Sequence, residues 1–117
     1  MQKGVLFVMT RPTDSASEAE YNDWYDNIHL EEVLQLHGFT AARRYRPVDS
    51  PEGVDSSGGI TWTYIALYEV EADDLQAVYA NLLGVAGRGE LRMSPAIRME
   101  EPEPIVQMFE LITQYPS

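Results

Sequence analysis

His29 is the residue whose type and setting best support chemistry. A histidine side chain titrates near neutral pH, so it can accept and release protons. Tyr25 stands four residues before it and Glu32 three residues after it, and such spacings place side chains side by side on a helix. The cluster predicts general acid/base chemistry, with His29 carrying the proton and Tyr25 assisting. The alternative is a structural histidine that caps the helix or binds a backbone carbonyl.

Glu32 and the arginines have two interpretations each. A carboxylate beside an apolar face needs a partner, so a salt bridge from Glu32 to Arg43 or Arg44 is favoured over contact with His29 or a substrate. Arg43, Arg44 and Arg46 form the one basic cluster of the chain. Arg43 is a candidate to hold a carboxylate or phenolate substrate, although balancing nearby acidic groups is the simpler role.

Aromatic residues supply further candidates for substrate binding. Tyr21, Trp24 and Tyr25 form a stripe at helical spacing, and Trp62 and Tyr64 alternate along a strand, which places them on one face. Such residues are favourable walls for a small-molecule cavity because buried phenol and indole groups need polar partners. Packing in the core or in a dimer interface is the alternative.

No metal or cofactor is expected. The chain has no cysteine and two histidines, His29 and His37, and their separation of eight residues matches no metal-ligand spacing. Gly87-Arg88-Gly89 is a poor phosphate loop because no strand precedes it. One alternative stays open, in which His29 is a single axial ligand to haem.

The elements that position these residues follow from hydrophobic spacing. Residues 5–9 predict a strand with two apolar faces, and the three- and four-residue steps from Tyr21 to Ile28 predict a helix. Ser17 and Glu20 form a capping-box pattern at its start. The stretch 30–36 is either a second short helix or a bent continuation, and it ends at Gly38.

The second half of the chain repeats this alternation. Strands are expected over 39–48 and 59–71, joined by a polar loop at 49–59. A helix with Asp73 as its cap carries an apolar series from Leu75 to Leu83, and Gly84 and later glycines interrupt it. Residues 88–103 are ambiguous, and 105–115 predict a last, long strand.

This order, β-α-β-β-α-β, predicts an α+β, ferredoxin-like fold in one domain over residues 1–117, with four antiparallel strands and two main helices on one face. Apolar residues occupy both faces of the strands. Two helices can cover only one face, so we expect a homodimer that packs sheet against sheet as an α/β barrel.

The segment 24–39, with Trp24, Tyr25, His29, Gly38 and Phe39 at their characteristic spacing, resembles the EthD-like branch of the dimeric α/β-barrel superfamily. The chain departs from that branch at two positions where prolines are common. Glutamates follow His29, and His37 stands before Gly38. The resemblance implies a small-molecule pocket between sheet and helices or inside the barrel. Relatives include cofactor-independent cyclases and monooxygenases, isomerases and haem-degrading oxygenases.

The net charge of −11 disfavours nucleic acid and membrane partners. No signal peptide or membrane span is expected, which indicates a cytoplasmic protein. The leading hypothesis is a cofactor-independent enzyme that acts on a small apolar, aromatic or polyketide-like molecule as a cyclase, isomerase, decarboxylase or monooxygenase. The alternative is a non-catalytic binding or regulatory homodimer.

Overall fold

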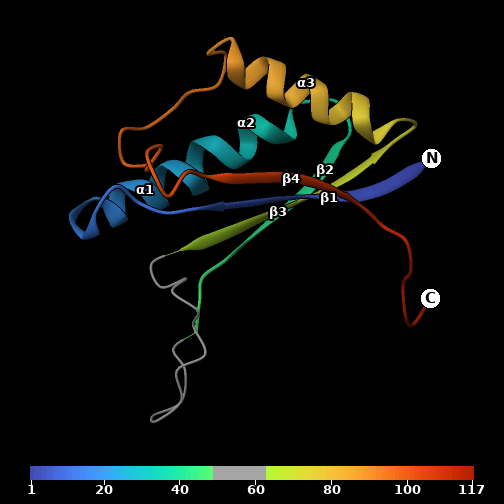
Figure 1. Cartoon of the computed structure of the whole chain (residues 1–117), viewed down its shortest axis with the longest axis horizontal. Helices are drawn as coiled ribbons and strands as arrows, with labels where there is room; N and C mark the ends of the chain where they lie inside the picture. The colour runs from blue at the N-terminus through green and yellow to red at the C-terminus, as the bar shows by residue number, and fades with distance from the viewer. Residues whose placement is uncertain (49–62) are drawn as a thin grey trace.

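The computed structural model describes residues 1–48 and 63–117. Their strands and helices run in the order strand, helix, strand, strand, helix, strand (Figure 1). The elements are β1 (Gln2–Thr10), η1 (Ser15–Ser17), α1 (Glu18–Trp24), η2 (Tyr25–His29), α2 (Leu30–Leu34), β2 (Phe39–Tyr45), β3 (Tyr64–Ala72), α3 (Leu75–Gly87) and β4 (Ile105–Glu110). The expected loop at 49–59 and Trp62 lie outside the described residues.

The four strands form one antiparallel sheet in the order β2-β3-β1-β4. The helices all lie over one face of this sheet, as Figure 1 shows. This arrangement confirms the ferredoxin-like α+β fold that the sequence predicts.

Side-chain alternation along the two central strands divides the sheet into a buried face and an open face. Leu6 and Val8 of β1 point toward the helices, and their register partners Tyr68 and Ala66 of β3 do the same. These residues pack against Val78 and the other apolar residues of the helices in one continuous core. The hydrophobic effect of this burial holds the helices on the sheet.

The open face of the sheet is apolar at its centre and charged toward one end. The apolar residues alternate with the core residues of the same strands and are Val5, Phe7, Met9, Ile65, Leu67, Ile105 and Phe109. Phe7 and Phe109 meet edge to face at 6.2 Å, and Phe109 is 51% exposed. Nothing in the described part of the chain covers this centre, as the sequence anticipates for a face that a second copy would bury.

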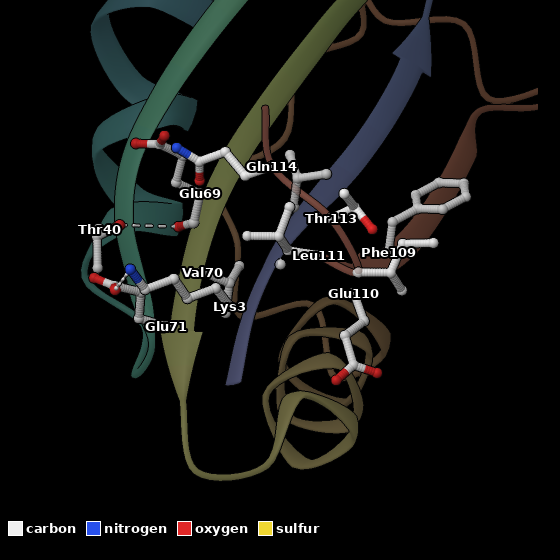
Figure 2. A pocket seen from close by; sticks show the side chains of 13 residues that line it. Lys3, Thr40, Glu69, Val70, Glu71, Phe109, Glu110, Leu111, Thr113 and Gln114 are labelled. Carbon is white, nitrogen blue, oxygen red and sulfur yellow. Dashed lines mark hydrogen bonds and ion pairs between the residues drawn. The ribbon is translucent and has the colours of Figure 1, made fainter. Parts of the chain in front are cut away.

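A hollow of about 580 Å³ lies at the charged end of the open face, between the sheet and the segment that follows β4. Figure 2 shows Glu69 and Glu71 on one side of it and Leu111 with Thr113 on the other. The ion pairs Lys3–Glu71 and Arg43–Glu69 form here, at 3.6 and 3.4 Å. Both pairs are largely exposed, so each adds little stability.

The ends of several elements differ from the sequence prediction. Asp14, not Ser17, caps the first helical stretch by accepting from the Ser17 backbone N–H at 2.8 Å. Asp74, not Asp73, caps α3 by accepting from two backbone N–H groups. α3 also continues through Gly84, because packing against the sheet outweighs the weak helix propensity of one glycine.

The last strand is shorter than expected, since β4 ends at Glu110. Residues 88–104 form an irregular connection, with one β-bridge between Pro12 and Ile97. In Figure 1 this connection runs from the end of α3, past α1, to the start of β4, and its residues Ala96 and Ile97 belong to the core.

Candidate functional site

A cavity of about 150 Å³ lies between the sheet and the helices, and its wall is almost entirely apolar. β1, β3 and β4 contribute to the wall from the sheet, the first helical stretch and α3 contribute from the helix layer, and the connection 88–104, here called the roof, completes the wall. The lining residues are Leu6, Val8, Thr10, Trp24, Tyr25, His29, Val33, Tyr68, Leu82, Leu83, Ala86, Leu91, Met93, Ile97, Met99, Pro104 and Val106. Three of the predicted site residues, His29, Tyr25 and Trp24, therefore meet at one cavity.

The helix changes its winding at the point where it presents His29. Residues Tyr25–His29 form one π-helical turn, closed by the Leu30 backbone N–H donating to the Tyr25 carbonyl. A π turn joins residues five apart, so it brings His29 over Trp24 as well as beside Tyr25. Of the two alternatives that the sequence leaves open, the stretch after His29 is thus a continuation of the helix.

Two aromatic rings hold the imidazole of His29. The Trp24 indole stacks on it, with centroids 4.5 Å apart and 23° between the planes. The Tyr25 ring meets it edge-on at 5.0 Å. Nδ1 is buried and has no hydrogen-bond partner within residues 1–48 and 63–117. A polar atom kept in this state is unusual in a folded protein.

Burial sets the protonation state of these groups. Desolvation lowers the pKa of His29 to about 4, and the nearby Glu32 carboxylate opposes the shift only weakly. Burial, with a smaller effect of Tyr21, raises the pKa of Tyr25 to about 12. At neutral pH the cavity therefore holds a neutral imidazole beside a protonated phenol.

Tyr68 is a cavity residue that the sequence reasoning missed. It lies at the centre of β3, is 1% exposed, and its hydroxyl has no hydrogen-bond partner in the described structure. Burial raises the pKa of Tyr68 far above the usual range. The available signal was the spacing along the strand. Tyr68 stands four residues after Tyr64, so both side chains lie on the face of the sheet that the helices cover.

Glu32 holds the roof of the cavity in place. Its Oε1 accepts from the Arg92 backbone N–H at 2.8 Å, while the Trp24 Nε1–H donates to the Arg92 carbonyl at 2.8 Å. Leu91 and Met93, on either side of Arg92, line the cavity. Glu32 thus has a backbone partner in place of the expected arginine, while Arg43 and Arg44 pair with Glu69 and Asp26.

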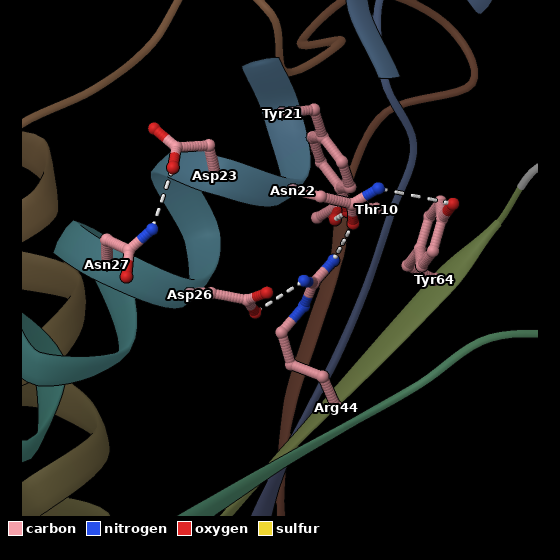
Figure 3. A network of polar contacts seen from close by, with 8 residues as sticks. All are labelled: Thr10, Tyr21, Asn22, Asp23, Asp26, Asn27, Arg44 and Tyr64. Atoms are coloured by element: carbon pink, nitrogen blue, oxygen red, sulfur yellow. Dashed lines mark hydrogen bonds and ion pairs between the residues drawn. The ribbon is translucent and has the colours of Figure 1, made fainter. Parts of the chain in front are cut away.

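Arg44 organises a polar cluster behind the cavity (Figure 3). Its guanidinium donates to Asp26 at 2.7 Å and to Asn22 at 2.8 Å. The same group lies 4.5 Å from the Tyr25 ring centroid, and 5.5 and 5.3 Å from those of Tyr21 and Tyr64. Arg44 therefore has protein partners for its charge, and it stabilises the aromatic stripe from outside the cavity.

The remaining predicted residues lie away from the cavity. The Tyr21 hydroxyl hydrogen-bonds to Thr10, so Tyr21 reaches the wall only through that residue. Tyr64 donates to Glu18 at 2.7 Å and accepts from Asn22, as Figure 3 shows for the second bond. Arg43 lies on the open face and pairs with Glu69. These contacts give Tyr64 and Arg43 partners of their own.

Two further features bear on the class of site. Within the described residues, no group of three His, Cys, Asp or Glu side chains is placed to hold a metal ion. The helices found there are also too short or too polar to cross a lipid bilayer.

Comparison with known proteins identifies one relative by sequence. No family model matches the chain. Core atranone cluster (CAC) protein 1 from Stachybotrys chlorohalonatus is 34% identical over 77 residues, which is 65% of this chain and 29% of that protein. The chain thus matches less than a third of the length of this relative.

Two solved structures share the fold. A dimeric ferredoxin-like protein from an uncultured marine organism superposes with a TM-score of 0.61 and 12% identity, covering 97% of this chain and 99% of that one. The haem degrader MhuD from Mycobacterium tuberculosis, solved with two haems in its active site, gives 0.57 and 17%, covering 94% and 97%. The chain is accordingly a ferredoxin-like α+β protein, the fold of these dimeric and ligand-binding neighbours.

Proposed function

We propose that this protein is a cofactor-independent enzyme that moves a proton on a small, largely apolar molecule, with His29 as the base. The observation that carries the proposal is a neutral imidazole, with an unpartnered buried nitrogen, in the wall of an apolar cavity. Aromatic and polyketide-like ketones are the favoured substrates. Cyclisation, isomerisation and decarboxylation all begin with, or pass through, the enolate that such a base can form.

The size and polarity of the cavity define the ligand. An apolar cavity of roughly 150 Å³ is known to hold a molecule the size of benzene. The cavity here is of that size, so it accepts one ring, or one ring of a longer molecule that extends through the opening. Its few polar groups, from Thr10, Tyr25, His29 and Tyr68, favour a ligand with one oxygen function over a charged one.

The step at His29 is proton abstraction next to a carbonyl. The imidazole accepts the proton, the C–H electron pair forms a C=C bond, and the carbonyl π pair moves to oxygen. The Trp24 and Tyr25 rings fix the imidazole from two sides, so its position is set before the ligand arrives. The Tyr25 phenol assists because it stays protonated and therefore places no negative charge beside the imidazole.

We also propose that the chain belongs to the EthD-like branch of the dimeric α/β-barrel superfamily and forms a homodimer. The Trp24-Tyr25-His29 cluster that carries the resemblance lies together in the cavity, and the open face of the sheet is apolar enough to bury against a second copy. The dimeric fold neighbour supports the homodimer, and the relative named for the atranone cluster supports a small-molecule ligand.

Haem does not fit the cavity as the residues shape it. His29 is placed to serve as a single ligand, and the fold neighbour MhuD binds haem. The cavity, however, is smaller than the roughly 300–1,000 Å³ of pockets for drug-sized ligands, and haem is a large macrocycle. The proposed chemistry therefore uses the residues of the cavity without haem.

Deuterium exchange into 2-indanone tests the proposal. This ketone has one aromatic ring and acidic C–H bonds next to its carbonyl, and their exchange in D₂O is followed by ¹H NMR. The wild-type protein is expected to accelerate exchange over buffer, and His29→Gln is expected to lose at least about tenfold of that acceleration. The matched control is His37→Gln, which removes the other, exposed histidine and should leave exchange unchanged.

The outcomes separate the candidate functions. Saturable binding of 2-indanone with no accelerated exchange would support the non-catalytic binding module. Equal exchange by wild type and His29→Gln would remove His29 from the chemistry. A Soret band that forms with added haem and disappears in His29→Gln would favour the haem alternative.

A further inference from the structure

We infer that Tyr68 is the second ligand-contacting residue of the cavity, and that its hydroxyl donates a hydrogen bond to the carbonyl or enolate oxygen of the bound molecule. This inference rests on the proposed function and narrows the ligand class to oxygen-bearing aromatic or alicyclic ketones and their enols. Tyr68 is not among the site residues that the sequence analysis predicts.

The hydroxyl of Tyr68 is unsatisfied within the described structure. Tyr68 is 1% exposed, and its oxygen has no hydrogen-bond partner. Leaving a buried hydroxyl unpaired costs stability, and the large majority of buried polar groups in proteins therefore have a partner. The residue lines the cavity, which is where a partner from outside the chain would enter.

The other tyrosines of this region show the contrast. Tyr21 bonds to Thr10, Tyr64 donates to Glu18, and Tyr79 donates to the Val106 carbonyl at 2.9 Å. Each of these hydroxyls has a protein acceptor or donor. The Tyr68 hydroxyl has no partner that meets hydrogen-bond geometry, although the Tyr25 phenol lies near enough to raise its pKa. Tyr68 stands on β3, an inner strand of the sheet, and a buried donor without a partner is suited to a ligand oxygen.

The protonation states of the two cavity groups are complementary. Burial raises the pKa of Tyr68, and the neighbouring Tyr25 raises it further, so the hydroxyl remains a donor at any physiological pH. His29 is neutral under the same conditions. Proton abstraction by His29 moves negative charge onto the ligand oxygen, and a fixed donor at that oxygen stabilises the enolate more than the ketone.

Tyr68→Phe tests the inference, because it removes the hydroxyl and keeps the ring. The readouts are the affinities for 2-indanone and for indane, which has the same ring system without the oxygen, and the infrared C=O frequency of bound 2-indanone. Tyr68→Phe should weaken 2-indanone binding about tenfold and leave indane binding unchanged. It should also shift the C=O band upward, toward that of a free carbonyl.

Tyr79→Phe is the matched control. Tyr79 does not line the cavity, and its hydroxyl donates to the backbone carbonyl of Val106, so Tyr79→Phe should lower stability without changing either affinity or the infrared band. Because Tyr68→Phe removes an unpaired hydroxyl, it should fold at least as stably as the wild type, which thermal unfolding checks.

The failures of the two proposals are distinguishable. If wild type binds 2-indanone no better than indane, or if the C=O band is the same in wild type and Tyr68→Phe, the role of Tyr68 is wrong; a buried water that satisfies the hydroxyl would give that result. If the band and the affinity change as expected but no exchange occurs, Tyr68 binds the ligand and only the catalytic role of His29 is wrong.

Discussion

The indole ring of Trp24 lies flat against the imidazole of His29, with 4.5 Å between the ring centroids. The two residues are five apart, a separation that a regular α-helix would place on different sides. The π turn at Tyr25–His29 makes this contact. Because the same indole also donates a hydrogen bond to the Arg92 carbonyl, one side chain links the candidate base to the roof of the cavity.

The depressed pKa of His29 predicts how stability depends on pH. The folded protein binds this proton only near pH 4, whereas the unfolded chain binds it near 6.5. Stability is therefore fully present above pH 6.5 and is lost as the pH falls toward 4, by up to about 3 kcal/mol. Urea unfolding at several pH values should show this loss in the wild type and a flatter profile in His29→Gln.

The same shift predicts the pH profile of proton exchange. Tyr25, Tyr68 and Glu32 are the titratable groups around His29, and both phenols stay protonated at neutral pH. The acceleration of 2-indanone exchange should thus be constant above about pH 5 and decline as His29 becomes protonated near pH 4. A decline centred near pH 6.5 would mean that an exposed imidazole performs the exchange.

Glu32 is expected to keep the roof closed. Glu32→Ala removes the acceptor of the Arg92 backbone N–H, so hydrogen exchange at that amide should become at least about tenfold faster. The adjacent, exposed Glu31 offers the control, since Glu31→Ala removes the same charge and should leave the amide protected. Similar protection in Glu32→Ala would show that Trp24 and the apolar contacts alone close the cavity.

Arg44 and Arg43 should differ strongly although they are neighbours in the chain. Arg44→Met removes the bonds to Asp26 and Asn22 and the contact with three tyrosine rings, at an expected loss of about 1–3 kcal/mol in stability. Arg43→Met breaks one exposed pair and should cost less than about 1 kcal/mol. Denaturant midpoints compare the two, and equal losses would contradict the buried role of Arg44.

The open face of the sheet predicts self-association. Phe109 is half-exposed, so Phe109→Glu should be tolerated in a single subunit. In a sheet-to-sheet dimer the same substitution would bury an unpaired charge, which should weaken the association of the two subunits. Light scattering should report a dimer for wild type and a monomer for this variant. Gln76→Glu, which adds the same charge to exposed α3, should stay dimeric; a monomeric wild type would refute the dimer.

The sequence predicted the parts of this molecule that follow from local patterns. Alternating strands and the apolar series from Leu75 to Leu82 specify the element order, and helical spacing brings Tyr25 and His29 together. The π turn was not predictable, because it depends on how the helix packs. Tyr68 and the Arg92 contacts were missed for a related reason: the wall of the cavity joins residues far apart in the chain, and the connection that carries Arg92 has no periodic signal.

The nitrogen NMR spectrum of His29 at pH 7 tests the central claim most directly. In protein labelled with ¹⁵N-histidine, the two ring nitrogens of His29 should have the widely separated shifts of a neutral imidazole, with His37 as the internal reference. Adding 4-methylphenol, which can donate a hydrogen bond, should move the unprotonated nitrogen of His29 and leave His37 unchanged. Imidazolium shifts at pH 7, or no movement at saturating phenol, would contradict the account.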